Sequence, residues 1–122
     1  MKNAINWFEI PVTDIDKAAS LYGRILGRPL RLEDAGGHPS AVFSYDGKEA
    51  VSGSLIADPA RPRGGGTVIY LDAPDGVDAC LARATAGGAK AVLPVTSIGP
   101  NGWIALFADL DGNVVGLHSE QR

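Results

Sequence analysis

The feature that most constrains this chain is an order of local signals that occurs twice. The stretch Ile15-Asp16-Lys17-Ala18 is matched roughly 62 residues later by Val77-Asp78-Ala79-Cys80, and the turn dipeptide Asp46-Gly47 is matched roughly 65 residues later by Asp111-Gly112. Two unrelated landmarks that recur at nearly the same offset indicate that one structural unit is used twice. We therefore expect both halves of the chain to contain the same elements in the same order.

The first unit opens with a strand pattern at residues 5–12. Phe8 and Ile10 fall on one side of a period-two alternation, whereas Trp7 and Glu9 fall on the other side. The pattern predicts a strand with an apolar face for the core and a second face that can carry chemistry.

A helix is predicted directly after this strand, over residues 15–26. Thr13 or Asp14 can accept hydrogen bonds from the unpaired N–H groups at its start, and Asp16 completes a capping-box pattern. Apolar side chains follow at helical spacing, and Gly27 can adopt the left-handed conformation that ends many helices.

The rest of the first unit is predicted to be three strands, at residues 28–33, 40–45 and 48–57. The segment Asp34 to Pro39 is expected to be a loop because of its two glycines and its proline. Asp46-Gly47 is a dipeptide typical of a type I′ hairpin turn, so it is expected to join the last two strands.

The second unit repeats this order. A strand at residues 67–72 is followed by a helix that Asp75 is expected to cap and that Gly87-Gly88 ends. Three more strands are predicted at residues 89–95, 103–108 and 113–119, and Asp111-Gly112 turns the last pair into a hairpin. Residues 1–122 are thus expected to be a single domain of two modules, about 1–57 and 67–119, joined by a Pro/Gly-rich linker at 58–66.

The predicted fold class is α+β, with paired βαβββ modules that form a cupped, mixed, mostly antiparallel sheet and carry their helices on the convex face. An apolar and aromatic concave face with a few polar groups is typical of a small-molecule site. By strand parity, that face is expected to carry Trp7, Glu9, Ser52, Ser54, Val68, Tyr70, Trp103, Ala105, Phe107, Val114, Gly116 and His118. A register slip of one residue in any strand would invert the assignment of that strand.

Composition excludes several classes of function. The net charge is −3 and the basic residues are scattered, so no nucleic-acid surface is expected. No apolar run is long enough for a membrane span or a signal segment, and we expect a cytoplasmic protein.

Cys80 is the single cysteine, and its expected role is that of a small buried hydrophobic residue.

The sequence resembles the vicinal oxygen chelate superfamily, which contains glyoxalase I, bleomycin-resistance proteins and extradiol dioxygenases. The resemblance covers essentially the whole chain. It rests on Phe8-Glu9-Ile10-Pro11-Val12-Thr13-Asp14, on Tyr22-x-x-Ile25-Leu26-Gly27, on the Gly-Gly after the second helix and on Asp109-Leu110-Asp111-Gly112-Asn113. It implies paired βαβββ modules and commonly a homodimer.

The resemblance also implies a divalent metal held by His and Glu side chains from four strands. The corresponding positions here are Trp7, Ser52 or Gly53, Gly66 or Thr67, and Gly116. These residues offer no imidazole or carboxylate, and zinc sites normally have three or four such ligands. We therefore expect no metal and no other cofactor.

Glu9 and His118 are the remaining candidates for catalysis. Both fall on the expected concave face, where they could act as a general base and its partner. The preferred interpretation is that Glu9 pairs with a nearby basic residue and that His118 is partly exposed near the end of the chain. His38, between Gly37 and Pro39, is expected to be a loop residue.

The candidate ligand-binding residues are Trp7, Glu9, Ser52, Tyr70, Trp103, Phe107 and His118. The aromatic members either pack together as core or stack on a planar or cationic ligand.

The leading hypothesis is a metal-independent, dimeric protein of the glyoxalase/bleomycin-resistance type that binds a small molecule in an aromatic pocket around Trp7. One alternative is an enzyme, either a metal-dependent glyoxalase I-like lyase, isomerase or dioxygenase, or a metal-free enzyme that uses Glu9 and His118. Another is a degenerate module that serves only for dimerisation. The fold by itself does not rank them, because one scaffold carries many chemistries.

Overall fold

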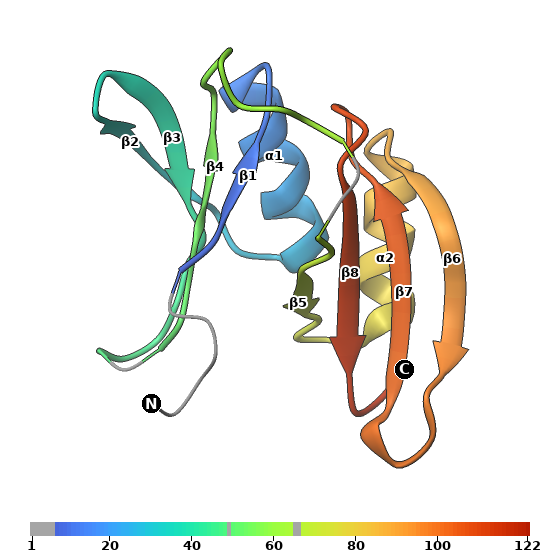
Figure 1. Ribbon diagram of the computed structural model, residues 1–122. Helices are drawn as coiled ribbons and strands as arrows, with labels where there is room; N and C mark the ends of the chain where they lie inside the picture. The colour runs from blue at the N-terminus through green and yellow to red at the C-terminus, as the bar shows by residue number, and fades with distance from the viewer. Residues whose placement is uncertain (1–6, 49, 65–66) are drawn as a thin grey trace. The chain divides into compact units, whose positions relative to one another are not determined.

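The computed structural model describes residues 7–48, 50–64 and 67–122 (Figure 1). Two compact units are present: Met1–Gly23 with Arg28–Arg63, and Arg24–Gly27 with Gly64–Arg122. Among the described residues, no helix has the length and apolar character needed to cross a membrane.

The first unit contains a four-stranded sheet. Its elements are β1 (Glu9–Pro11), α1 (Ile15–Leu26), β2 (Arg31–Ala35), β3 (His38–Val42) and β4 (Ser54–Ile56), and the last turn of α1 belongs to the second unit. The strand order is β1-β4-β3-β2, in which β1 is parallel to β4 and the other neighbours are antiparallel.

The second unit repeats this topology. Its elements are β5 (Tyr70–Asp72), α2 (Val77–Ala86), β6 (Lys90–Ser97), the short 3₁₀ helix η1 (Gly99–Asn101), β7 (Trp103–Ala108) and β8 (Val114–Ser119). The strand order is β5-β8-β7-β6, again with one parallel pair, β5 with β8, and two antiparallel pairs. The prediction of an α+β fold with two βαβββ modules is confirmed.

Helix α1 forms where the sequence predicts it. The Asp14 side chain accepts a hydrogen bond from the backbone N–H of Lys17 at 3.1 Å, and Gly27 has a left-handed φ of 71°. Tyr22 is fully buried, and its ring meets that of Phe43 edge-on with 5.5 Å between centroids. The local signals of cap, apolar stripe and terminal glycine therefore agree with tertiary packing.

The predicted loop at Asp34 to Pro39 is wrong. β2 and β3 form a tight hairpin in which Ala35 pairs with His38, so only Gly36 and Gly37 lie outside the strands. Both glycines have positive φ, 61° and 88°, which is the requirement of a type I′ turn. His38 is consequently a strand residue rather than a loop residue.

The predicted type I′ turn at Asp46-Gly47 is also wrong. Gly47 has a φ of 84°, but no described residue other than glycine has a positive φ, and a type I′ turn needs two such residues. The connection between β3 and β4 is long and spans residues 43–53. β4 is only three residues long, far shorter than the expected strand at 48–57. β1 is likewise shorter than expected, and Ile5 and Asn6 lie outside the described residues.

Asp75 does not cap α2, contrary to the sequence prediction. The N-cap residue is Gly76, with no hydrogen bond from a capping side chain. The Asp75 carboxylate instead accepts two hydrogen bonds from the guanidinium of Arg83, at 2.8 and 2.7 Å. Arg83 also donates to the backbone oxygens of Arg24 and Ile25, so this side chain joins the last turn of α1 to α2 within the second unit.

Candidate functional site

The second sheet has one face covered by α2 and a second face that we call the far face. α2 packs against β6, β7 and β8, as Figure 1 shows. Alternate residues of β5, β7 and β8 are fully or almost fully buried, and these are Leu71, Ala105, Phe107, Val115 and Leu117. Because side chains alternate along a strand, their neighbours Tyr70, Asp72, Ile104 and His118 lie on the far face.

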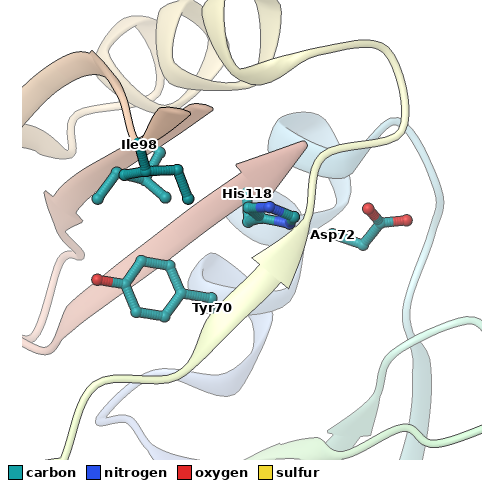
Figure 2. A pocket seen from close by; sticks show the side chains of 5 residues that line it. Tyr70, Asp72, Ile98 and His118 are labelled. Carbon is teal, nitrogen blue, oxygen red and sulfur yellow. The ribbon is translucent and has the colours of Figure 1, made fainter. Parts of the chain in front are cut away.

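A pocket of about 420 Å³ lies on the far face. Tyr70, Asp72, Ile98, Ile104 and His118 line it, and Figure 2 labels Tyr70 and Asp72 on β5, His118 on β8, and Ile98. Volumes of this order are typical of sites for small organic molecules.

Strand register brings these residues together. Asp72 is the Cα partner of His118 on the parallel strand β8, and Ile104 is the partner of His118 on the antiparallel strand β7. Paired residues point to the same face of a sheet, so three adjacent strands each contribute a side chain. Ile98 comes from the connection between β6 and β7.

His118 is half-buried and holds that connection in place. Its Nε2 lies 2.7 Å from the backbone oxygen of Asn101 in η1. A carbonyl oxygen only accepts hydrogen bonds, so Nε2 carries a proton in this contact, and Nδ1 is the ring nitrogen left for another partner. The bond ties η1, which follows Ile98 directly, to β8.

Asp72 and Tyr70 carry the other polar groups of the pocket. Both side chains are exposed, and neither forms a hydrogen bond or an ion pair within the described ranges 7–48, 50–64 and 67–122. The Tyr70 ring covers Gly116, the residue paired with it on β8. The pocket thus combines apolar walls with a carboxylate, a phenol and an imidazole.

Of the predicted ligand-binding residues in the second unit, Tyr70 and His118 line the pocket. The expected placement of Trp103 and Phe107 on the same face is wrong. Phe107 pairs with Val115 and is fully buried on the α2 side, and the Trp103 ring lies on that side under the guanidinium of Arg122, at 4.7 Å. Their ligand-binding role stays a prediction.

The candidates in the first unit have other partners. Glu9 accepts a hydrogen bond from Arg61 at 2.6 Å, in agreement with the interpretation that it pairs with a nearby base. The Ser52 hydroxyl is buried and donates to the backbone oxygen of Phe43 at 2.8 Å. Trp7 is exposed, and no further role for it follows from the described contacts.

The positions that would hold the metal implied by the resemblance do not fit one. A Cβ atom at Gly116 would overlap the Tyr70 ring, and at Gly53 it would lie 2.5 Å from both the ring and the backbone oxygen of Phe8. Gly66 lies outside the described residues. Within the described residues, no group of three His, Cys, Asp or Glu side chains is placed to hold a metal ion.

Sequence reasoning missed Asp72, Ile98 and Ile104. Asp72 could have been found, because it is two residues from Tyr70 and therefore shares its face. The expected placement of Trp103, Ala105 and Phe107 on the concave face leaves Ile104 on the other face, because β7 is apolar at every position and carries no polarity contrast. Ile98 lies between strands, where periodicity gives no signal.

Comparisons with known proteins place this geometry in context. A model described as "Glyoxalase/Bleomycin resistance protein/Dioxygenase superfamily" matches residues 4–117. The curated relatives are "Putative glyoxylase CFP32" of Mycobacterium bovis and of Mycobacterium tuberculosis, each 28% identical over 96% of this chain and 46% of the relative. This chain thus spans about half the length of the curated relatives it matches.

Solved structures share the fold. A glyoxalase/bleomycin resistance protein from Albidiferax ferrireducens T118 aligns with a TM-score of 0.78 at 18% identity, covering 98% of this chain and 99% of that chain. TnmS3, an antibiotic binding protein from Streptomyces sp. CB03234, aligns with a TM-score of 0.63 at 30% identity, covering 98% and 95%. The first similarity shows the fold alone, whereas the second extends to sequence.

Proposed function

Because this chain belongs to the Glyoxalase/Bleomycin resistance protein/Dioxygenase superfamily, we propose that it binds a small organic molecule in the far-face pocket of its second module, without a bound metal. The observation that carries the proposal is the pocket itself, which Ile98, Ile104 and the Tyr70 ring line together with the polar groups of Asp72 and His118. Apolar walls with a few orienting polar groups are the usual composition of such sites.

Two further points support binding. TnmS3, at 30% identity, binds an antibiotic, so the same fold with a related sequence serves as a binding protein. The implied metal positions at Gly53 and Gly116 have no room for a ligand side chain. The protein is proposed to act as a homodimer, as the family resemblance implies, and light scattering of purified protein measures its mass directly.

The test is a titration followed by amide chemical shifts in NMR spectra. A panel of small aromatic, amine and dicarbonyl compounds is added to the protein, and at least one compound is expected to shift Tyr70, Asp72, Ile104 and His118. The variant Ile98→Trp places a large ring in the lining of the pocket and should abolish these shifts. Ile98 is 40% exposed, so the variant should fold.

The matched control is Val92→Trp, which changes a similarly exposed residue, at 52%, that does not line the pocket. This variant should bind as the parent does. Binding that survives Ile98→Trp, or a panel in which no compound shifts the pocket residues, would contradict the proposed function.

A second candidate function is catalysis, which the name of the mycobacterial relatives, putative glyoxylase, favours. In that case the dicarbonyl compounds of the panel would be consumed rather than only bound. Turnover is measured as loss of their absorbance, with and without added divalent metal. A rate that disappears in Ile98→Trp and persists in Val92→Trp would assign the reaction to this pocket.

A further inference from the structure

Asp72 is a fixed negative charge in the wall of the pocket. Asp72 is the last residue of β5, and both of its neighbours, Leu71 and Ala73, are buried. The Ala73 N–H donates a hydrogen bond to the His118 carbonyl at 2.9 Å, so the backbone on either side of Asp72 is fixed in position. Its carboxylate forms no ion pair with any described residue. The charge is therefore available to a ligand.

The arginines of residues 64–122 are engaged on the opposite side of the sheet. Arg83 pairs with Asp75 at 2.7 Å, and Arg122 pairs with Asp78 of α2 at 2.9 Å. Neither of these guanidinium groups lines the pocket.

The remaining basic residue of this stretch, Lys90, is remote from the pocket. Lys90 pairs with Ala108 on β7. Ala108 is four residues from Ile104, so the Cα atoms of these two β7 residues lie roughly 13 Å apart. Residues 64–122 contain Asp72, Asp75, Asp78, Asp109, Asp111 and Glu120 against these three bases. Residues 64–122 therefore carry more negative than positive charge.

The other groups of the pocket suit the same kind of ligand. Nε2 of His118 is already used by Asn101, so Nδ1 is the ring nitrogen left to a ligand. The Tyr70 ring is about half exposed, so one face of it can contact a cation. Ile98 and Ile104 can contact the apolar part of the same ligand.

We infer that the pocket selects organic amines in their protonated form, with Asp72 as the counter-ion and the Tyr70 ring and the two isoleucines around the apolar body. This inference rests on the proposed function and adds the chemical class of the ligand. Neutral molecules of the same shape should bind more weakly, because they leave the Asp72 carboxylate without a partner.

Matched probe pairs test it. The first probe is phenethylamine and the second is 2-phenylethanol, which has nearly the same shape and no charge. Amide shifts are followed at pH 8 in the parent protein, in Asp72→Asn and in Asp72→Glu. Asp72→Asn is expected to weaken phenethylamine binding about three- to tenfold and to leave 2-phenylethanol within about twofold.

Asp72→Glu keeps the charge and should retain the preference for the amine. Asp34→Asn removes the same charge from the exposed strand β2 of the first unit and should bind as the parent does. Added salt should weaken phenethylamine binding and leave 2-phenylethanol binding unchanged, since only the first involves an ion pair.

The outcomes separate the inference from the function on which it rests. The inference is overturned if 2-phenylethanol binds the pocket residues as tightly as phenethylamine, or if Asp72→Asn changes the affinity of neither probe. In both cases the proposed binding function stands. If neither probe, nor any compound of the wider panel, shifts the pocket residues, the proposed function fails together with the inference.

Discussion

The ring of Tyr70 lies directly against Gly116, its register partner on β8, and leaves no room for a Cβ atom at that position. In the first unit, Phe8 covers Gly53 in a similar way. Both glycines fall at or next to positions where the resemblance implies metal ligands. In each sheet, an aromatic ring beside the parallel strand pair occupies the space that a ligand side chain would need.

The Tyr70–Gly116 contact predicts a specific coupling. Gly116→Ala should lower the free energy of unfolding by about 1–3 kcal/mol, because the new methyl group meets the Tyr70 ring. In a Tyr70→Ala background the same change should cost much less, since the obstructing ring is gone. Urea unfolding of the four proteins gives the coupling energy, and strictly additive effects would contradict the contact.

Gly53 offers a contrasting case. A Cβ atom there would meet the Phe8 backbone oxygen, which accepts a hydrogen bond from the Ser54 N–H at 2.9 Å, as well as the Phe8 ring. Backbone cannot rotate away, so Gly53→Ala should cost more than Gly116→Ala. In a Phe8→Ala background, Gly53→Ala should lower the free energy of unfolding by nearly as much as in the parent. If the loss instead shrinks as much as Tyr70→Ala shrinks that of Gly116→Ala, the backbone contact is unimportant.

The repeat, the capped first helix and the fold class could be predicted because local signals agreed with tertiary structure there. The far face could be predicted only where a strand has polarity contrast. Tyr70 and His118 alternate with buried leucines, and their predicted face agrees with the structure. In contrast, β7 reads Trp-Ile-Ala-Leu-Phe-Ala and has no polar residue to distinguish its faces. Phe107 was therefore placed on the wrong side.

Two local predictions failed for physical reasons that the spacing of residues does not show. Gly36-Gly37 forms the tight hairpin turn, since two glycines adopt positive φ at no steric cost, whereas Asp46 would have to adopt it against the preference of a side-chain-bearing residue. Asp75 is of a residue type that is favoured at N-caps, but its carboxylate accepts stronger, charge-assisted hydrogen bonds from the nearby guanidinium of Arg83. Neither outcome could be read from sequence spacing alone.

Arg83 is expected to be the most important charged residue for stability in the second unit. It donates to the backbone oxygens of Arg24 and Ile25, which lie in the last turn of α1 and have no partner within the helix. Arg83→Met should lower the free energy of unfolding by about 1–3 kcal/mol. The control Arg28→Met removes only the exposed pair with Asp46 and should cost less than about 1 kcal/mol.

Acid unfolding should reveal the same cluster. Hydrogen bonds from Arg83 lower the pKa of the Asp75 carboxyl from 3.8 to about 2. A lowered pKa in the folded state stabilises the protein above the ordinary value, and this stabilisation is lost as the pH falls from about 4 towards 2. The stability difference between the parent and Asp75→Asn should shrink over that range, as measured by urea midpoints, and should already be absent in an Arg83→Met background.

The Cys80 thiol should be inert while the protein is folded. Burial, with a smaller contribution from the Asp75 carboxylate, raises the pKa of Cys80 from 9.0 to about 11. The thiolate is the reactive form, so at pH 8 the thiolate fraction is about a hundredfold lower than in an unfolded chain. Iodoacetamide labelling followed by mass spectrometry should therefore be slow in the native protein and fast in urea.

The sign of the Cys80 shift also predicts an alkaline effect. Because its pKa is raised on folding, the stabilisation is present below about pH 9 and is lost as the pH rises towards 11. Cys80→Ala removes this titration and should reduce the loss of stability over that range, although it costs packing because the side chain is fully buried. Rapid, stoichiometric labelling of the folded protein at pH 8 would show that Cys80 is accessible, and the buried-hydrophobe role would then be wrong.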